Sequence, residues 1–137
     1  MAEDRAQFQA RLFGTFVKEA AVHLAAMPVL LDRLEQEPGG GEGGDAGGSD
    51  AARDLLREIH SLKGAAGAVE QSQVEFLCRA LEQLAAKLVR GECAADATFL
   101  EAFRSGLALL GDGLAQLTHG GTFTVSLQFL QSMRKLM

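Results

Sequence analysis

The sequence predicts an all-α protein, an antiparallel up-and-down four-helix bundle with room for a fifth helix at its C-terminus. Leucine, alanine and phenylalanine dominate the apolar residues, and tryptophan and tyrosine are absent, which favours helices over sheet. Apolar residues recur every three or four positions along four segments, and the connections between most of them are short, as in a bundle. A chain of 137 residues fits one domain with one core.

The first helix is expected at about residues 3–35. Pro28 lies inside it and is expected to kink or break it, because proline removes a backbone donor and crowds the preceding turn. Residues 38–49 are mainly Gly, Asp, Glu and Ala and predict a flexible loop. The apolar face of this helix is formed by Phe8, Leu12, Phe16, Ala20, Leu24, Met27, Leu31 and Leu34.

Two helices follow the loop. Ser49 or Asp50 is expected to cap the first of them, and Ser72 with Glu75 forms a capping-box pattern that opens the second. Gly91 is placed to end the second of these helices. The expected buried positions are Leu55, Ile59, Leu62, Ala66 and Val69 in the former and Val74, Leu77, Leu81, Leu84 and Leu88 in the latter.

A fourth helix is expected between an Asp96 cap and the pair Gly120 and Gly121. Residues 1–121 would then form the bundle, and residues 122–137 a further helix or a tail. The apolar stripe of the fourth helix is Phe99, Phe103, Leu107, Leu110, Leu114 and Leu117, and that of the last segment is Val125, Phe129, Leu130, Met133 and Leu136.

Charge and composition exclude several classes of partner. The formal charge of −5 with scattered basic residues argues against nucleic acid. The longest apolar stretch, residues 20–31, contains His23 and Pro28 and is too short to cross a bilayer, so no membrane insertion is expected. The N-terminus does not read as a secretory leader, and Cys78 and Cys93 are expected to be free thiols or small apolar fillers in a cytoplasmic protein.

The most informative segment is residues 60–67, His-Ser-Leu-Lys-Gly-Ala-Ala-Gly. On a helix, His60, Lys63, Gly64 and Gly67 share one face, with Leu56 beside the histidine. A glycine inside a helix costs about 1 kcal/mol relative to alanine, so two glycines need a compensating reason. We expect that another molecule approaches the helix here and that His60 accepts a phosphoryl group.

This segment resembles the signature of histidine phosphotransfer (HPt) domains, most closely the amino-terminal domain of CheA-type chemotaxis kinases, over about residues 5–120. The resemblance implies that an ATP-binding kinase domain phosphorylates His60 on Nε2 and that the group passes to a response-regulator aspartate. By position, Lys63 is the neighbouring cation, and Gly64 and Gly67 provide clearance.

The third predicted helix extends the resemblance. Residues 78–82 and the following Gly91-Glu92 are similar to the chemotaxis-kinase pattern, in which a glutamate hydrogen-bonds the phosphorylated imidazole. Glu82 occupies that position. A carboxylate that accepts the Nδ1 proton of His60 would fix the tautomer and make Nε2 the better nucleophile.

Two positions depart from the family pattern. Glu70 stands where HPt domains usually have another glycine, which makes the tightness of the turn into the third helix a question. Arg79 stands where many relatives have histidine, and it could contact a phosphate or form a salt bridge with Glu75.

Simpler interpretations exist for individual residues. A lone histidine is usually structural, and a helix lysine or glutamate such as Lys63 or Glu82 usually faces solvent. His23 and His119 lack the neighbouring lysine and glycines of His60 and are most simply surface or capping residues. No metal ligands converge, so no metal site is expected, and no cofactor. The Gly-rich loop lacks the Gly-Lys-Ser/Thr ending of a phosphate-binding loop.

The resulting hypothesis is a two-component phosphorelay domain that is not an enzyme by itself, since it has no ATP site. Its expected partners are a histidine kinase catalytic domain and a response-regulator receiver domain. It could be the amino-terminal part of a chemotaxis-type kinase or a free-standing HPt protein. The rival from another class is a non-catalytic helical docking adaptor, and an enzyme that uses His60 as general base lacks supporting residues.

Overall fold

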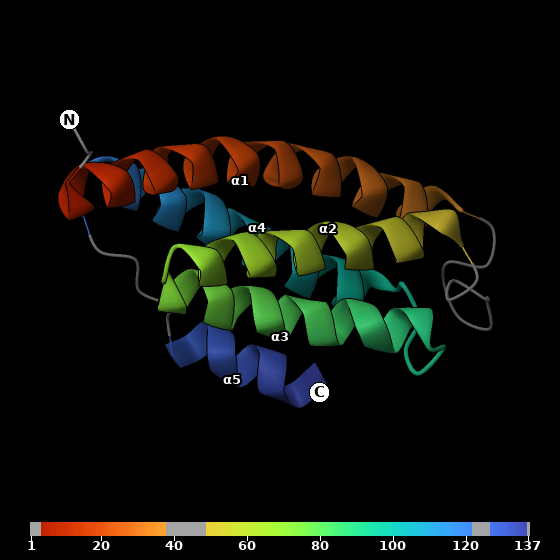
Figure 1. Ribbon diagram of the computed structural model, residues 1–137. Helices are drawn as coiled ribbons and strands as arrows, with labels where there is room; N and C mark the ends of the chain where they lie inside the picture. Colours follow the sequence, from red (N-terminus) through yellow and green to blue (C-terminus); the bar gives the residue numbers. More distant parts are fainter. Residues whose placement is uncertain (1–3, 38–48, 122–126, 137) are drawn as a thin grey trace.

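The computed structural model describes residues 4–37, 49–121 and 127–136, and these contain helices but no strand. The all-α prediction is confirmed. Figure 1 shows α2 and α3 as a hairpin, with α1 along one edge of the bundle and α5 at the other. The helices are α1 (Arg5–Gln36), α2 (Asp50–Ala68), α3 (Ser72–Val89), α4 (Ala97–Thr118) and α5 (Leu127–Leu136).

One hydrophobic core joins the helices. α2 packs between α1 and α3, and α4 packs against both α1 and α3. The apolar stripes predicted for α2, α3 and α4 supply half of the buried core residues, although Val69 and Leu117 are only partly buried. The largest fully buried side chains are Phe16, Phe103, Met27, Leu31, Leu34, Leu55, Ile59, Leu62, Leu77, Leu81, Leu84 and Leu88.

The structure bears on two expectations about α1. Of the kink or break expected at Pro28, the break does not occur: the helix continues through Pro28, which lies on the exposed side while its neighbours Met27 and Leu30 hold the other side in the core. Phe8 is not a core residue: 46% of its surface is exposed. The guanidinium of Arg11 lies 5.3 Å from the centre of its ring, within the range of a cation–π contact.

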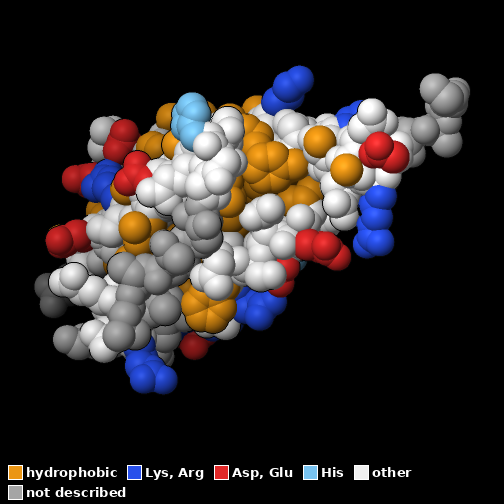
Figure 2. All heavy atoms as spheres, turned by 90° about the vertical axis from the view of Figure 1, so that its left-hand side faces the viewer, with side chains coloured by type: hydrophobic (Ala, Val, Ile, Leu, Met, Phe, Trp, Pro, Cys, Tyr) orange, Lys and Arg blue, Asp and Glu red, His pale blue; other side chains and the backbone are white. Residues whose placement is uncertain are grey.

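Phe8 borders a hollow at the end of the bundle. Figure 2 shows hydrophobic side chains at the surface of this end, among charged ones. The hollow has a volume of about 690 Å³, and Phe13, Val69 and Glu70 also line it. The start of α1 is thus less covered than its apolar pattern suggests.

Helix starts follow local sequence where a short polar side chain precedes the helix. Ser49 accepts a hydrogen bond from the Ala52 amide at 3.0 Å, and Asp96 accepts one from the Phe99 amide at 2.9 Å, as predicted. The capping box predicted at the start of α3 is wrong. Gln71 is the N-cap residue there and makes no side-chain capping bond. The Glu75 side chain accepts a hydrogen bond from Arg79.

Three helices end in the same type of turn, in which the two residues after the cap donate backwards to the last helical turn. Gly91 and Gly120 occupy the left-handed position after α3 and α4, with φ of +75° and +83°. After α2 this position is Glu70, at φ +59°. The Gln71 amide still donates a hydrogen bond to the Ala66 carbonyl at 2.9 Å. The turn after α2 therefore has the same hydrogen bonds as the two glycine turns.

The C-terminal segment contains α5, whose Phe129 and Met133 are buried against the bundle. The loop predicted at 38–49, apart from Ser49, and residues 122–126 with Val125 lie outside the described residues. Among described helices, α1 alone is long and apolar enough to cross a membrane by length and composition, so its apolar stretch is longer than the residues 20–31 on which the expectation rested. One face of α1 is part of the bundle core.

Candidate functional site

His60 lies on α2 at the border between the solvent and the side of the helix that faces α3. Its neighbour Ile59 is fully buried, and a step of one residue along a helix turns the side chain by about 100°. His60 therefore stands at the edge of the core face, with 67% of its side chain exposed. An imidazole in this position can be reached from outside the protein.

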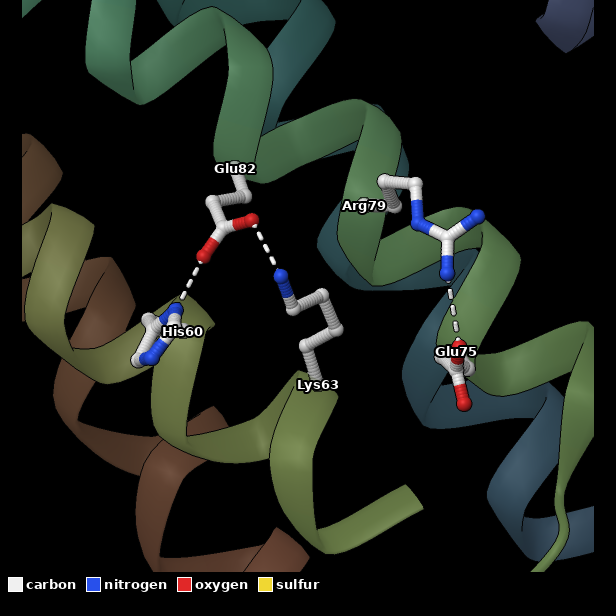
Figure 3. A network of polar contacts seen from close by, with 5 residues as sticks. All are labelled: His60, Lys63, Glu75, Arg79 and Glu82. Atoms are coloured by element: carbon white, nitrogen blue, oxygen red, sulfur yellow. Dashed lines mark hydrogen bonds and ion pairs between the residues drawn. The ribbon is translucent and has the colours of Figure 1, made fainter. Parts of the chain in front are cut away.

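Glu82 on α3 joins the two helices at this point. Its Oε2 contacts Nδ1 of His60, and its Oε1 accepts a hydrogen bond from Nζ of Lys63 at 2.6 Å. Figure 3 shows the carboxylate between the two α2 side chains. Only 18% of the Glu82 side chain is exposed, so the carboxylate interacts mainly with these two partners and little with water.

The charge of Glu82 follows from these contacts. Burial alone would raise its pKa, but hydrogen bonds and charges from Lys63 and His60 outweigh burial and hold the pKa below its usual value. Glu82 is thus ionised at neutral pH. An ionised carboxylate only accepts hydrogen bonds, so Nδ1 of His60 carries the proton and Nε2 of the neutral ring keeps a free lone pair.

The two glycines on this face differ in their surroundings. A Cβ placed on Gly64 would meet nothing within 4 Å, so this position is open to another molecule. A Cβ on Gly67 would lie 2.7 Å from Oε2 of Glu75 on α3. The clearance predicted at Gly67 is therefore taken up by the protein itself, because α3 packs against α2 there.

Arg79 is paired rather than directed at His60. Its guanidinium donates to Oε1 of Glu75 at 2.7 Å, one helical turn earlier on α3. Of the two roles left open for Arg79, the salt bridge is the one observed. Just over half of its side chain remains exposed on the face that carries Glu82.

A groove of about 900 Å³ adjoins His60 between α2 and α3. Leu56, predicted to lie beside the histidine, is half-buried in its wall. The other lining residues were not expected from the sequence, although helical spacing from His60 and Glu82 indicates several of them. These residues are Arg53, Arg57, Gln83, Ala86, Lys87, Val89, Arg90 and Glu92.

The other two histidines have structural surroundings. Nδ1 of His23 on α1 lies 2.6 Å from Oε2 of Glu58 on α2, a partner that the sequence did not suggest because the two are far apart in the chain. His119 is the exposed C-cap residue of α4. Within residues 4–37, 49–121 and 127–136, no group of His, Cys, Asp or Glu side chains could hold a metal ion.

The model of the Hpt domain family matches residues 11–119, which include α2, α3 and the whole polar network. The chain belongs to the Hpt domain family. A comparison with curated proteins finds no match. As an Hpt domain, this chain is a phosphotransfer module of two-component signalling, of the kind that works with kinases and response regulators.

Proposed function

We propose that His60 is the phosphoryl-accepting residue of this Hpt domain, with Nε2 as the nucleophile. The observation that carries the proposal is an exposed imidazole whose Nδ1 contacts an ionised carboxylate, which leaves Nε2 toward solvent. The other two histidines have neither this exposure next to a carboxylate nor a neighbouring lysine. Chemistry at His60 therefore requires the least rearrangement.

The proposed relay has two steps. In the first, the Nε2 lone pair attacks the γ-phosphorus of ATP held by a histidine kinase domain, the N–P bond forms, and ADP leaves with the electrons of the broken P–O bond. In the second, a receiver aspartate attacks the phosphorus, the N–P bond breaks, and its electron pair returns to Nε2. The chain supplies no ATP site of its own in this scheme and is not an enzyme alone.

Neighbouring residues assist each step. The ring gains positive charge when Nε2 is phosphorylated, and the Glu82 carboxylate on Nδ1 offsets this charge. Lys63 holds Glu82 in place and adds positive charge near the phosphoryl oxygens. Gly64 leaves the helix surface bare where a kinase or receiver domain must approach.

We further propose that the chain is the amino-terminal phosphotransfer part of a chemotaxis-type kinase that acts in the cytoplasm. The support is the carboxylate on the third helix of the bundle, which the resemblance to CheA-type kinases also places there. A free-standing Hpt protein that serves other kinases is the alternative within the same chemistry.

Phosphorylation with radiolabelled ATP and a histidine kinase catalytic domain tests the acceptor. The native chain is expected to take up acid-labile, base-stable label, and His60→Gln is expected to take up none. His119→Gln is the matched control, since it removes an exposed imidazole elsewhere in the bundle. Equal labelling of the native chain and His60→Gln would reject the proposal and favour the docking-adaptor alternative.

A further inference from the structure

The outer side of α1 is apolar but has no partner among the described helices. Val22 and Val29 are 68% and 59% exposed, and they are two of the four large hydrophobic side chains that are exposed among the described residues. Ala21, Ala25 and Pro28 are exposed beside them. A helix that is apolar on both sides is normally covered on both sides.

These residues form one continuous stripe. Val22 and Val29 are seven positions apart, so they lie on the same side of the helix with Ala25 between them. Figure 1 shows α1 as one edge of the bundle, with α2 and α4 on its inner side. The stripe therefore faces away from the core that Met27, Leu31 and Leu34 help to form.

Opposite charges bound the stripe. Lys18 lies seven residues before Ala25, and Asp32 lies seven residues after it, so all three occupy the same side of α1. Lys18 makes no ion pair with another described residue. Asp32 accepts a hydrogen bond from Arg104 on α4 at 2.8 Å, yet 65% of its side chain remains exposed.

We propose that this face of α1 pairs with the same face of a second copy of the chain, with the two helices antiparallel. A two-fold axis through Ala25 places Lys18 of each copy opposite Asp32 of the other, and it superposes the apolar centre of the stripe on itself. The small side chain of Ala25 lets the helices approach closely at the axis. The stripe is thus self-complementary in both shape and charge.

The composition of the face argues for a second copy over a lipid surface. Helices that lie on membranes carry many Lys and Arg beside large apolar residues such as Leu, Phe or Trp. Here the exposed apolar residues are Ala, Val and Pro, and the exposed charged residues beside them are mixed in sign, with Lys18 and Arg33 against Glu19, Asp32 and Glu35.

The pairing is expected to be weak and independent of the phosphorelay. The stripe from Lys18 to Asp32 is only about 21 Å long at 1.5 Å per residue, which is small for a stable interface. His60 lies on the α2–α3 side, so the paired and single forms both present it. The inference goes beyond the proposed function and can fail without affecting it.

Sedimentation equilibrium on the full chain, from low micromolar to near-millimolar concentration, tests the proposal. The average mass of the native chain is expected to rise toward twice that of one chain. Val22→Glu with Val29→Glu is expected to abolish the rise, and both sites are exposed enough to leave folding intact. Phe76→Glu, at a 48% exposed phenylalanine on α3, is the control and should behave as the native chain.

Charge exchange tests the antiparallel geometry. Lys18→Glu and Asp32→Lys should each weaken self-association, because each creates two like-charged pairs across the axis. An equimolar mixture of the two variants should associate again, because both cross-axis pairs then have opposite charges. Circular dichroism checks that Asp32→Lys stays folded after it loses its contact with Arg104.

Three results would overturn the proposal. The first is a native mass that does not change with concentration. The second is a mixture of the charge variants that associates no better than either variant alone. The third is binding to phosphatidylcholine or phosphatidylserine vesicles that the valine variants abolish while the free chain stays a single copy, which would assign the face to a membrane.

Discussion

Among single residues, Glu82 has the largest number of partners at the proposed site, since one carboxylate contacts both His60 and Lys63. Glu82→Gln keeps the shape and removes the charge. We expect the rate of His60 phosphorylation to fall roughly ten- to a hundredfold, the range found for groups that orient a metal-binding histidine through its other ring nitrogen. Single-turnover labelling measures this, and Glu75→Gln on the same helix is the control.

The same variant has a pH signature in stability. The pKa of Glu82 is lower in the folded chain than the usual value of 4.5 for a glutamate. A lowered carboxylate pKa contributes stability above the unfolded value, and the contribution is lost as pH falls through the folded pKa. The stability advantage of the native chain over Glu82→Gln should therefore be constant near neutral pH and shrink below about pH 4.5. Thermal unfolding across this range measures it.

Glu70 has a backbone conformation that suits glycine. At φ +59° a side chain costs about 1–2 kcal/mol, whereas glycine adds some entropy to the unfolded chain. We expect Glu70→Gly to stabilise the protein by roughly 0.5–1 kcal/mol. Urea unfolding measures this. Glu101→Gly, in the regular part of α4, should instead destabilise by about 1 kcal/mol.

At the scale of elements, the contact between α3 and α4 depends on Gly106. A Cβ there would lie 2.6 Å from Cδ2 of Leu81, which is fully buried. Gly111 is on the same helix, and a Cβ there would meet nothing within 4 Å. Alanine gains about 1 kcal/mol of helix propensity at both sites, but at Gly106 it also crowds the core.

We therefore expect Gly106→Ala to be less stable than Gly111→Ala by about 1–3 kcal/mol, the usual cost of overpacking. The free energy of unfolding in urea gives both values. Equal stability of the two variants would contradict the close packing of α3 on α4.

Sequence reasoning succeeded where the interaction is local. Asp96 could be identified as a cap, and Ser49 as one of two candidates beside Asp50, because a cap bonds an amide only three residues later. It failed at the start of α3 even though the signal there is also local. The helix begins one residue earlier than the Ser72 and Glu75 pattern implies, with Gln71 as the N-cap residue, and the Glu75 side chain pairs with Arg79 one turn later.

The same distinction applies to the candidate site. The spacing of His60, Lys63 and Gly64 on one helix face follows from helix geometry, and the Glu82 contact was suggested by a family pattern. The surroundings of Gly67 could not be predicted, because they depend on how closely α3 packs against α2. The groove beside His60 likewise requires the relative placement of two helices.

For the whole molecule, the two cysteines offer a readout of folding. Cys78 is fully buried in the core, and burial raises its pKa to about 12. Cys93 is half-buried and its pKa is raised less. Since the thiolate is the reactive form, we expect a thiol reagent at neutral pH to modify Cys93 first and Cys78 only when the bundle opens.

Mass spectrometry of the modified chain checks this order, and Cys93→Ser isolates the slow reaction. The raised pKa of Cys78 also has a stability consequence. The contribution of the neutral Cys78 thiol to the stability of the fold is present below pH 9, the pKa of the unfolded thiol. It is lost as the pH rises toward 12, so the bundle should be less stable in alkali.

The link between His60 and Glu82 joins α2 to α3 through two residues that are 22 positions apart in the chain. A peptide that contains α2 alone keeps the imidazole and loses the carboxylate. The imidazole is therefore activated only when α2 and α3 are paired, and a nascent or misfolded chain would be a poor substrate. The kinase would then phosphorylate only folded copies of the chain.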